Sequence, residues 1–244
     1  MKALLLAAGV GSRLKPLTDE TPKALIPVAG VPMLERVLVR LKAAGVKSFV
    51  VNAHHHAPKV AAFCAGLSRR HGVPVSVSRE DDLLLDTGGA IKKASALLRG
   101  REPFFVHNAD VLTALDYKAM RAAHEENAAL VTLAVRERDS SRALLFDAKG
   151  RLAGHDDRDA QRVSWAKTPA PGAARLAFDG IHLVSPALLD KITEGGVFSI
   201  LKTYLRLAGS GADLRAFRSD RWAWHDIGTI EKLAAAEAWA SKPC

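Results

Sequence analysis

The residues best suited to chemistry lie in a glycine-containing loop near the N-terminus, Gly9-Val10-Gly11-Ser12-Arg13. An apolar run, Leu4-Leu5-Leu6, precedes the loop, and Lys23 follows ten residues after the arginine. Glycines let a backbone approach an anion closely, so that its N–H groups can bind phosphate oxygens while two cations neutralise the charge. We therefore predict that this loop binds a triphosphate.

Two common phosphate-binding patterns do not describe this loop. A Walker A loop requires a lysine directly after its last glycine, where Ser12 stands, and a dinucleotide fingerprint requires a third small residue, where Leu14 stands. For Gly-x-Gly alone, an ordinary turn between a strand and a helix is an equal alternative. The cations Arg13 and Lys23, with the prolines Pro16 and Pro22, argue against that alternative.

Composition narrows the class of protein. The chain has 244 residues, of which 48% are hydrophobic, which suffices for one sizeable α/β domain. It has no apolar stretch long enough to span a membrane and no signal-peptide pattern, so we expect a cytoplasmic protein. The net charge of +9 is scattered and aromatics make up only 6%, which argues against a nucleic-acid partner. Cys64 and Cys244 share no motif and are expected to be reduced thiols.

Strand-like and helix-like runs alternate, which indicates a doubly wound α/β sheet. The predicted strands are Leu4–Leu6, Ser48–Asn52, Val75–Ser78, Phe104–Asn108, Ala129–Arg136, Arg175–Val184 and Leu214–Phe217, with a hairpin over Ala143–Asp147 and Arg151–Ala153. The predicted helices are Met33–Ala44, Pro58–Arg70, Gly88–Leu98, Tyr117–Glu125, Pro186–Ile192, Ile200–Leu207 and a last one that Thr229 caps and that runs through Trp239. Residues 154–174 are polar and contain prolines, and we predict an irregular insertion over the site.

Two aspartates lie where they could bind a divalent cation that is carried by a triphosphate. Asp110 comes soon after Phe104–Asn108, and Asp226 lies just before the last helix. Mg²⁺ prefers one or two carboxylates together with phosphate oxygens and water. A lone Asp in such a place is more often a cap or turn residue. The run His54-His55-His56 lacks the further ligands that zinc needs, and we expect a solvated loop there.

The N-terminal motifs resemble the signature of the sugar-1-phosphate nucleotidyltransferases. The match covers Leu-Ala-Ala-Gly-x-Gly-x-Arg-Leu-x-Pro-Leu-Thr at residues 6–18 and Pro-Lys-x-Leu-x-Pro-Val-x-Gly-x-Pro at residues 22–32, and weaker matches recur to the C-terminus. The resemblance implies a Rossmann-like, three-layer (GT-A-like) α/β fold with a mixed, mostly parallel central sheet. It implies one domain over residues 1–244, with an NTP-binding half at about 1–125 and a sugar-binding half at about 126–244.

The resemblance also implies a reaction: an NTP and a sugar 1-phosphate give an NDP-sugar and pyrophosphate. Asp110 and Asp226 lie in matches to the family's Asn-x-Asp and Trp-x-Asp-Ile/Val-Gly-Thr motifs, whose aspartates bind Mg²⁺. Ala109 departs from the usual Gly or Ser. Arg13 and Lys23 would act in catalysis. Nucleotide contacts are implied for Leu6, Ala8, Gly9, Gly11, Ser12, Arg13, Lys23, Thr87 and Gly88, and sugar contacts for Asn108, Asp179 and Gly180.

The motifs most resemble the bacterial N-acetylmuramate 1-phosphate uridylyltransferases of peptidoglycan recycling, which favours UTP as the nucleotide. Mannose-1-phosphate guanylyltransferases and glucose-1-phosphate thymidylyl- or uridylyltransferases share most of them. Phosphocholine cytidylyltransferase and a non-catalytic nucleotide-sugar sensor are further alternatives, although the intact set of charged residues argues against a sensor. Lys167 is an open candidate for the sugar phosphate. We expect neither a membrane nor a nucleic-acid partner, and a monomer or small homo-oligomer.

Overall fold

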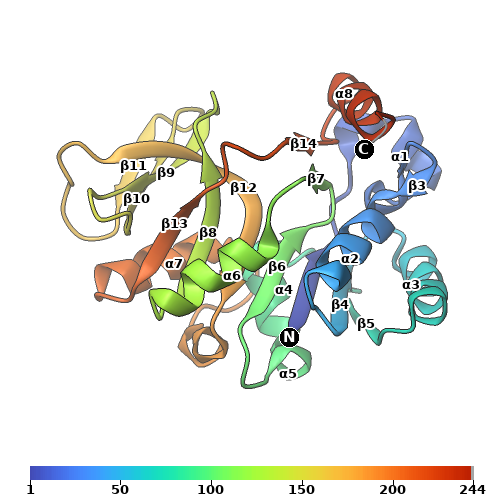
Figure 1. Ribbon diagram of the computed structural model, residues 1–244, viewed down its shortest axis with the longest axis horizontal. Helices are drawn as coiled ribbons and strands as arrows, with labels where there is room; N and C mark the ends of the chain where they lie inside the picture. The colour runs from blue at the N-terminus through green and yellow to red at the C-terminus, as the bar shows by residue number, and fades with distance from the viewer. Residues whose placement is uncertain (243–244) are drawn as a thin grey trace.

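The computed structural model describes residues 1–242, which form one ten-stranded mixed sheet with helices on both faces (Figure 1). The strand order is β11-β10-β9-β12-β6-β1-β4-β5, with β8 beside β12 and β13 beside β8. The predicted α/β class with a mixed sheet is confirmed. The sheet runs through both the NTP-binding and the sugar-binding half, and the boundary between the halves stays a prediction.

Four parallel strands form the N-terminal side of the sheet. They are β1 (Lys2–Leu6), β4 (Ser48–Ala53), β5 (Val75–Arg79) and β6 (Phe104–Asn108), and β1 lies between β4 and β6. The central residues of β1, β4 and β6 are buried on both faces, so that Leu5 packs in one core cluster and Leu4 in the other, whereas β5 is a partly exposed edge strand. The register pairs Leu6 with Asn52 and with Asn108, so three strands end level beneath the glycine loop.

The other side of the sheet is built around one long strand, β12 (Ala174–Val184). It pairs antiparallel with β6, β8 (Val131–Arg136) and β9 (Arg142–Phe146), and its register shifts between Phe178 and His182. The strand β13 (Leu214–Arg218) runs parallel to β8. A change from parallel to antiparallel pairing therefore occurs where β6 meets β12, next to the loop that follows β6.

The prediction of an irregular insertion over residues 154–174 is wrong for its first part, residues 154–165, whereas residues 166–173 form no helix or strand. Strands β10 (Leu152–Asp157) and β11 (Arg162–Trp165) extend the sheet beyond β9 to its edge. The charged residues Asp156 and Asp157 made the sequence of β10 look unlike a strand. In the fold their charges are paired across the sheet, with Arg175 at 2.6 Å and Arg142 at 3.3 Å. The predicted β9–β10 hairpin is confirmed.

The helices agree with the predicted ones apart from their ends. They are α2 (Met33–Ala43), α3 (Ala57–His71), α4 (Asp86–Lys93), α5 (Ser95–Leu98), α6 (Tyr117–Glu126), α7 (Ile200–Gly209) and α8 (Ile230–Ala240). The helix predicted over Gly88–Leu98 starts two residues earlier and is interrupted at Ala94. The segment η3 (Pro186–Lys191) is a 3₁₀ helix. Thr229 caps α8 as predicted, because its hydroxyl accepts a hydrogen bond from the Lys232 N–H at 3.4 Å.

Several short elements around the glycine loop escaped prediction. They are η1 (Ser12–Leu14), α1 (Leu17–Glu20), η2 (Lys23–Leu25), the pair β2 (Pro27–Val28) and β3 (Val31–Pro32), and the pair β7 (Val111–Thr113) and β14 (Trp224–Asp226). Figure 1 shows β7 and β14 in the middle of the view, between the parallel and the antiparallel side.

None of the helices in the described part of the chain is both long and apolar enough to cross a membrane. Cys64 is a buried free thiol whose pKa burial raises to about 12, as expected for a reduced, unreactive cysteine. Cys244 lies outside the described residues.

Candidate active site

The glycine loop turns sharply because Gly11 adopts a left-handed conformation with φ of +70°. A Cβ at this position would lie 2.8 Å from the Thr18 methyl and 3.1 Å from the Lys23 Cβ, so no larger residue fits. The Gly11 carbonyl accepts hydrogen bonds from the Leu14 N–H at 2.9 Å and the Thr18 hydroxyl at 2.9 Å. The loop is therefore built by its own side chains before any ligand arrives.

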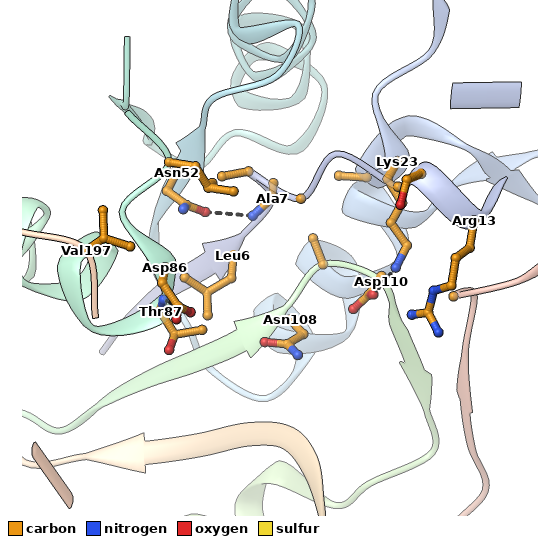
Figure 2. Close-up of a pocket in the computed structure, with 18 residues that line it drawn as sticks. Leu6, Ala7, Arg13, Lys23, Asn52, Asp86, Thr87, Asn108, Asp110 and Val197 are labelled. Carbon is orange, nitrogen blue, oxygen red and sulfur yellow. Dashed lines mark hydrogen bonds and ion pairs between the residues drawn. The ribbon is translucent and has the colours of Figure 1, made fainter. Parts of the chain in front are cut away.

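A cavity of about 510 Å³ opens beside this loop, at the carboxyl ends of the parallel strands (Figure 2). This is the edge at which doubly wound sheets bind ligands. Most of the predicted nucleotide contacts line it: Leu6, Ala8, Gly9, Gly11, Ser12, Arg13, Lys23 and Thr87. Asn108 and Asp110 line it too. The structure thus brings the predicted nucleotide loop, one predicted sugar residue and one predicted metal ligand together.

The cations of the site lie on one side of the cavity. Figure 2 shows Lys23 and Arg13 beside Asp110, with Asn52, Asp86, Thr87 and Val197 across the opening. The Lys23 ammonium forms an ion pair with Asp110. Within residues 1–242, Arg13 forms no ion pair, which leaves its guanidinium fork available to phosphate oxygens.

The two predicted metal ligands are neighbours, although 116 positions separate them in the sequence. Strands β7 and β14 pair antiparallel, and the Ile227 N–H donates to the Asp110 carbonyl at 3.0 Å. Asp226 accepts a hydrogen bond from the Gly228 N–H at 2.9 Å and pairs with Lys232 at 2.7 Å. Lys232 had no predicted role. Its only sequence signal is its position in the first turn of the helix that follows the aspartate.

This donor set fits Mg²⁺. Both groups are carboxylates, and Mg²⁺ commonly binds one or two carboxylates and completes its octahedron with phosphate oxygens and water. No group of three or more His, Cys, Asp or Glu residues within 1–242 could hold a metal by itself. Any ion here would therefore need ligands from the nucleotide. The binding of Mg²⁺ stays a prediction.

Asp179, a predicted sugar contact, does not line the cavity. Its side chain is only 1% exposed and accepts hydrogen bonds from the Arg136 guanidinium at 2.8 and 2.9 Å and from the Ser219 hydroxyl at 2.6 Å. This carboxylate is buried and links three elements: Asp179 on β12 binds Arg136 on β8 and Ser219, the residue after β13. A long-range pairing of this kind leaves no local signal in the sequence.

Gly180, the second predicted sugar contact on β12, has a packing reason to be glycine. It has φ of +76°, and a Cβ there would lie 2.5 Å from the Asn108 side-chain amide. The glycine therefore lets β12 pass close behind Asn108, which does line the cavity. Of the three predicted sugar residues, the structure brings only Asn108 to the cavity wall.

Gly88, a predicted nucleotide contact, does not line the cavity either. A Cβ at Gly88 would lie 2.2 Å from the Phe198 ring, and the Gly88 N–H donates to the Phe198 carbonyl at 2.9 Å. This glycine is needed for close packing of α4 against the segment before α7. Thr87 lines the cavity, and its hydroxyl accepts a hydrogen bond from the Ile200 N–H at 3.0 Å.

Sequence reasoning missed a buried relay behind the nucleotide side. Asn52 lines the cavity, its side-chain oxygen accepts from the Ala7 N–H at 2.7 Å, and its amide donates to Glu80 at 2.8 Å. The other carboxylate oxygen of Glu80 accepts from the Leu85 N–H at 2.9 Å. Glu80 is 1% exposed. The position of Asn52 at the end of a strand beside β1 was an available signal.

The histidine nearest to Asp110 in the sequence, His107, does not serve as a general base at the cavity. His107, three residues before Asp110, is fully buried, and this burial lowers its pKa to about 4. It is bonded to the Tyr117 hydroxyl at 2.9 Å. A neutral imidazole held in the core in this way supports packing and takes no proton from a substrate.

Comparisons with known proteins agree with this geometry. Residues 2–144 match the family model described as nucleotidyl transferase. The chain belongs to this family. It is 33% identical to the N-acetylmuramate alpha-1-phosphate uridylyltransferase of Neisseria meningitidis, over 98% of each chain. It is 32% identical to the enzyme of that name from Caulobacter vibrioides, over 97% of this chain and 95% of the relative. The expected family is therefore confirmed.

Solved structures support the fold in the same way. A Bacillus anthracis structure described as a glucose-1-phosphate thymidylyltransferase superimposes with a TM-score of 0.83 at 20% identity, covering 100% of this chain and 96% of that one. UDP-glucose pyrophosphorylase from Acinetobacter baumanii gives a TM-score of 0.78 at 17% identity, covering 97% and 91%. The predicted nucleotidyltransferase (GT-A-like) fold is confirmed.

Proposed function

We propose that this nucleotidyltransferase makes UDP-N-acetylmuramic acid and pyrophosphate from UTP and N-acetylmuramic acid 1-phosphate. The carrying observation is the cavity at the ends of β1 and β6, where Arg13, Lys23 and Asp110 meet beside a preformed glycine loop. Two relatives of that printed activity, which align over nearly their whole length, support the choice of substrates. A role in peptidoglycan recycling follows from the same proposal.

In this reaction an oxygen of the sugar phosphate attacks the α-phosphorus of UTP. A new P–O bond forms there, and the bond from the α-phosphorus to the bridging oxygen breaks, releasing pyrophosphate. The second pKa of a phosphate monoester is about 6, so the nucleophile is already ionised at neutral pH and needs no base. The chain's task is positioning and charge neutralisation.

Each cation of the site has a distinct place in this task. Arg13 would hold the leaving phosphates as a bidentate donor, together with the N–H groups of the turn at Gly11 and Ser12. Lys23 would reduce the repulsion between the attacking phosphate and the α-phosphate. Asp110 and Asp226 would hold Mg²⁺, which supplies further neutralisation of phosphate charge when bound.

Across the cavity, the uracil and ribose would lie against Leu6 and the 84–87 segment. Asn52 and Glu80 hold these two parts of the wall at a fixed separation through their hydrogen bonds to Ala7 and Leu85. Asn108 would contact the sugar. In this proposal, backbone and amide groups contact the nucleoside, and the charged side chains contact only the phosphates.

Pyrophosphate release measured over a matrix of nucleotides and sugar 1-phosphates tests the proposal. The matrix holds UTP, CTP, GTP, ATP and dTTP against the 1-phosphates of N-acetylmuramic acid, N-acetylglucosamine, glucose and mannose, each with Mg²⁺. We expect the highest kcat/KM for UTP with N-acetylmuramic acid 1-phosphate. Absence of pyrophosphate with every pair would refute catalysis and favour a nucleotide-sugar sensor. A higher kcat/KM for another pair would refute the substrate assignment alone.

A further inference from the structure

Two arginines at the end of β8, Arg136 and Arg138, face the same indole ring, that of Trp224. Their guanidinium carbons lie 5.5 Å and 4.5 Å from the ring centroid. The indole N–H donates to the Asp179 carbonyl at 3.0 Å, and Trp224 precedes Asp226 by two residues on β14. Both arginines therefore lie outside the cavity lining, against the strand that leads to Asp226.

Trp224 connects these arginines to the wall of the cavity. Its hydrogen bond to Asp179 holds it against the bend of β12, and the next residue, Gly180, packs against the Asn108 amide. Asn108 lines the cavity, and the strand of Trp224 continues to Asp226 beside Asp110. A group attached to a sugar at Asn108 would thus extend towards Trp224.

The two arginines differ in what they bind. Arg136 is saturated: its guanidinium donates twice to Asp179 and once, at 3.2 Å, to the Trp222 carbonyl. Within residues 1–242, Arg138 forms no ion pair and no side-chain hydrogen bond, and its Nε is buried without an acceptor. A buried N–H that gives up water without gaining an acceptor costs free energy. The Nη groups of the same guanidinium are not buried and also form no hydrogen bond within residues 1–242, so they are the donors that an incoming anion could reach.

The neighbouring carboxylates leave the charge of Arg138 uncompensated. Glu137 pairs with Arg218 at 2.8 Å, and Asp139 contacts Arg158 at 3.4 Å. The two acidic residues that flank Arg138 in the sequence thus have other partners. A guanidinium stacked on an indole is held flat by the ring and keeps its donors free at its edge, which suits a carboxylate approaching in the same plane.

We propose that Arg138 binds the lactyl carboxylate of N-acetylmuramic acid 1-phosphate and so selects this substrate over other sugar 1-phosphates. The inference rests on the proposed function. Muramic acid differs from glucosamine by a lactyl ether whose carboxylate is ionised at neutral pH. A bidentate guanidinium–carboxylate pair distinguishes these two sugars by charge. Arg138 is then a specificity-determining residue, and the phosphate chemistry does not depend on it.

The test compares two sugars that differ only in the lactyl group. The kcat/KM of wild-type protein and of Arg138→Gln is measured with UTP and either N-acetylmuramic acid or N-acetylglucosamine 1-phosphate. We expect Arg138→Gln to lower kcat/KM for the muramic substrate by about 10- to 100-fold, the value of a charged hydrogen bond, and to leave the glucosamine substrate within about twofold. Arg138→Lys keeps the charge without the fork and should recover part of the loss.

Arg221→Gln is the matched control, because Arg221 stacks on Trp222 at 4.1 Å in the same manner. It should change neither substrate. Calorimetry with UDP-N-acetylmuramic acid and UDP-N-acetylglucosamine measures the preference without turnover. The ratio of the two dissociation constants should change in Arg138→Gln as the ratio of the two kcat/KM values does. An equal loss on both sugars in Arg138→Gln, or an unchanged ratio, overturns the inference alone. If the wild-type protein showed no preference for the muramic substrate, the proposed function itself would be refuted, and the inference on Arg138 with it.

Discussion

The cavity joins two regions, the parallel strands that we propose bind the nucleotide (the nucleotide side) and the antiparallel strands that we propose bind the sugar (the sugar side), and the two are built by different means. On the nucleotide side, parallel strands end level. The Asn52 amide oxygen accepts from the Ala7 N–H, the Glu80 carboxylate accepts from the Leu85 N–H, and Asn52 and Glu80 bind each other. On the sugar side, antiparallel strands are tied by a buried ion pair, Arg136 with Asp179, and an adjacent tryptophan. The first region is held together through main-chain N–H groups, and the second through contacts between side chains.

The two sides meet at the pair of strands β7 and β14: Asp110 immediately precedes β7, and Asp226 is the last residue of β14. Each carboxylate is held by a lysine, Lys23 from the nucleotide side and Lys232 from the start of α8. The aspartates are thus fixed by both regions at once. We therefore expect a substitution at this junction to lower the turnover of the reaction itself. A substitution on one side should change the KM of one substrate only.

Replacing Asp110 by Asn is expected to have the largest effect. The amide keeps the size of the side chain but removes the charge that would hold Mg²⁺, and kcat should fall by about 10³-fold or more. Pyrophosphate release during a Mg²⁺ titration measures the effect. The thermal midpoint should change little, because Asp110 is partly exposed with 27% of its side chain accessible.

Asp190→Asn serves as the control for this substitution, since Asp190 is an exposed carboxylate paired with Arg99 at 2.6 Å, away from the cavity. It should retain full activity. If Asp110→Asn kept near-normal turnover with an unchanged Mg²⁺ requirement, the metal assignment would be wrong, and the junction would not unite the two sides.

The second prediction concerns the buried pair of the sugar side. Arg136→Leu leaves the Asp179 carboxylate buried without its partner, and breaking such a pair costs about 3–5 kcal/mol of the free energy of unfolding. Chemical denaturation measures it. The double variant Arg136→Leu with Asp179→Leu should recover most of the loss, because no lone charge remains. In any active protein that folds, KM should rise for the sugar phosphate and stay constant for UTP.

Arg99→Leu provides the matched comparison, because it breaks an exposed arginine–aspartate pair at similar distance. Exposed pairs contribute about 0–1 kcal/mol. Equal destabilisation by Arg136→Leu and Arg99→Leu would contradict the view that the sugar side depends on its buried charges.

The same difference explains what the sequence could reveal. On the nucleotide side, the sequence predicted many of the residues that line the cavity because a contiguous loop, Gly9 to Lys23, supplies five of them, but it missed Asn52 and wrongly placed Gly88 on the wall. The junction aspartates could be picked out because each lies in its own short motif, Asn-x-Asp for Asp110 and Trp-x-Asp-Ile-Gly-Thr for Asp226. Arg136 and Asp179 lie 43 positions apart and form their contact only through the register of β8 and β12. No local pattern encodes such a pairing.

Charge also concealed secondary structure on the sugar side. Asp156 and Asp157 lie on β10, where alternating hydrophobic residues would normally mark a strand. Their arginine partners come from β9 and β12, so the strand is stabilised by cross-strand ion pairs that only the assembled sheet brings together. The nucleotide side has its own hidden group in Glu80, which reads as a surface glutamate in the sequence and is buried in the fold.

Glu80→Gln should give the smallest effect and the one that best separates the two sides. Glutamine has one acceptor oxygen, so it can accept from Asn52 or from Leu85 but must turn an N–H towards the other donor. Losing one such hydrogen bond costs about 1–2 kcal/mol, which should raise KM for UTP by up to about tenfold with kcat and sugar-phosphate KM nearly constant. Initial rates over a grid of both substrates separate these constants.

Asp81→Asn controls for this change, because Asp81 is the next residue and pairs with Arg79 at 2.7 Å on the surface. It should alter neither KM. A rise in the KM for the sugar phosphate in Glu80→Gln would mean that the relay from Ala7 to Leu85 supports both sides of the cavity. An effect on UTP alone would mean that the parallel strands position the nucleotide independently of the charged network that positions the sugar.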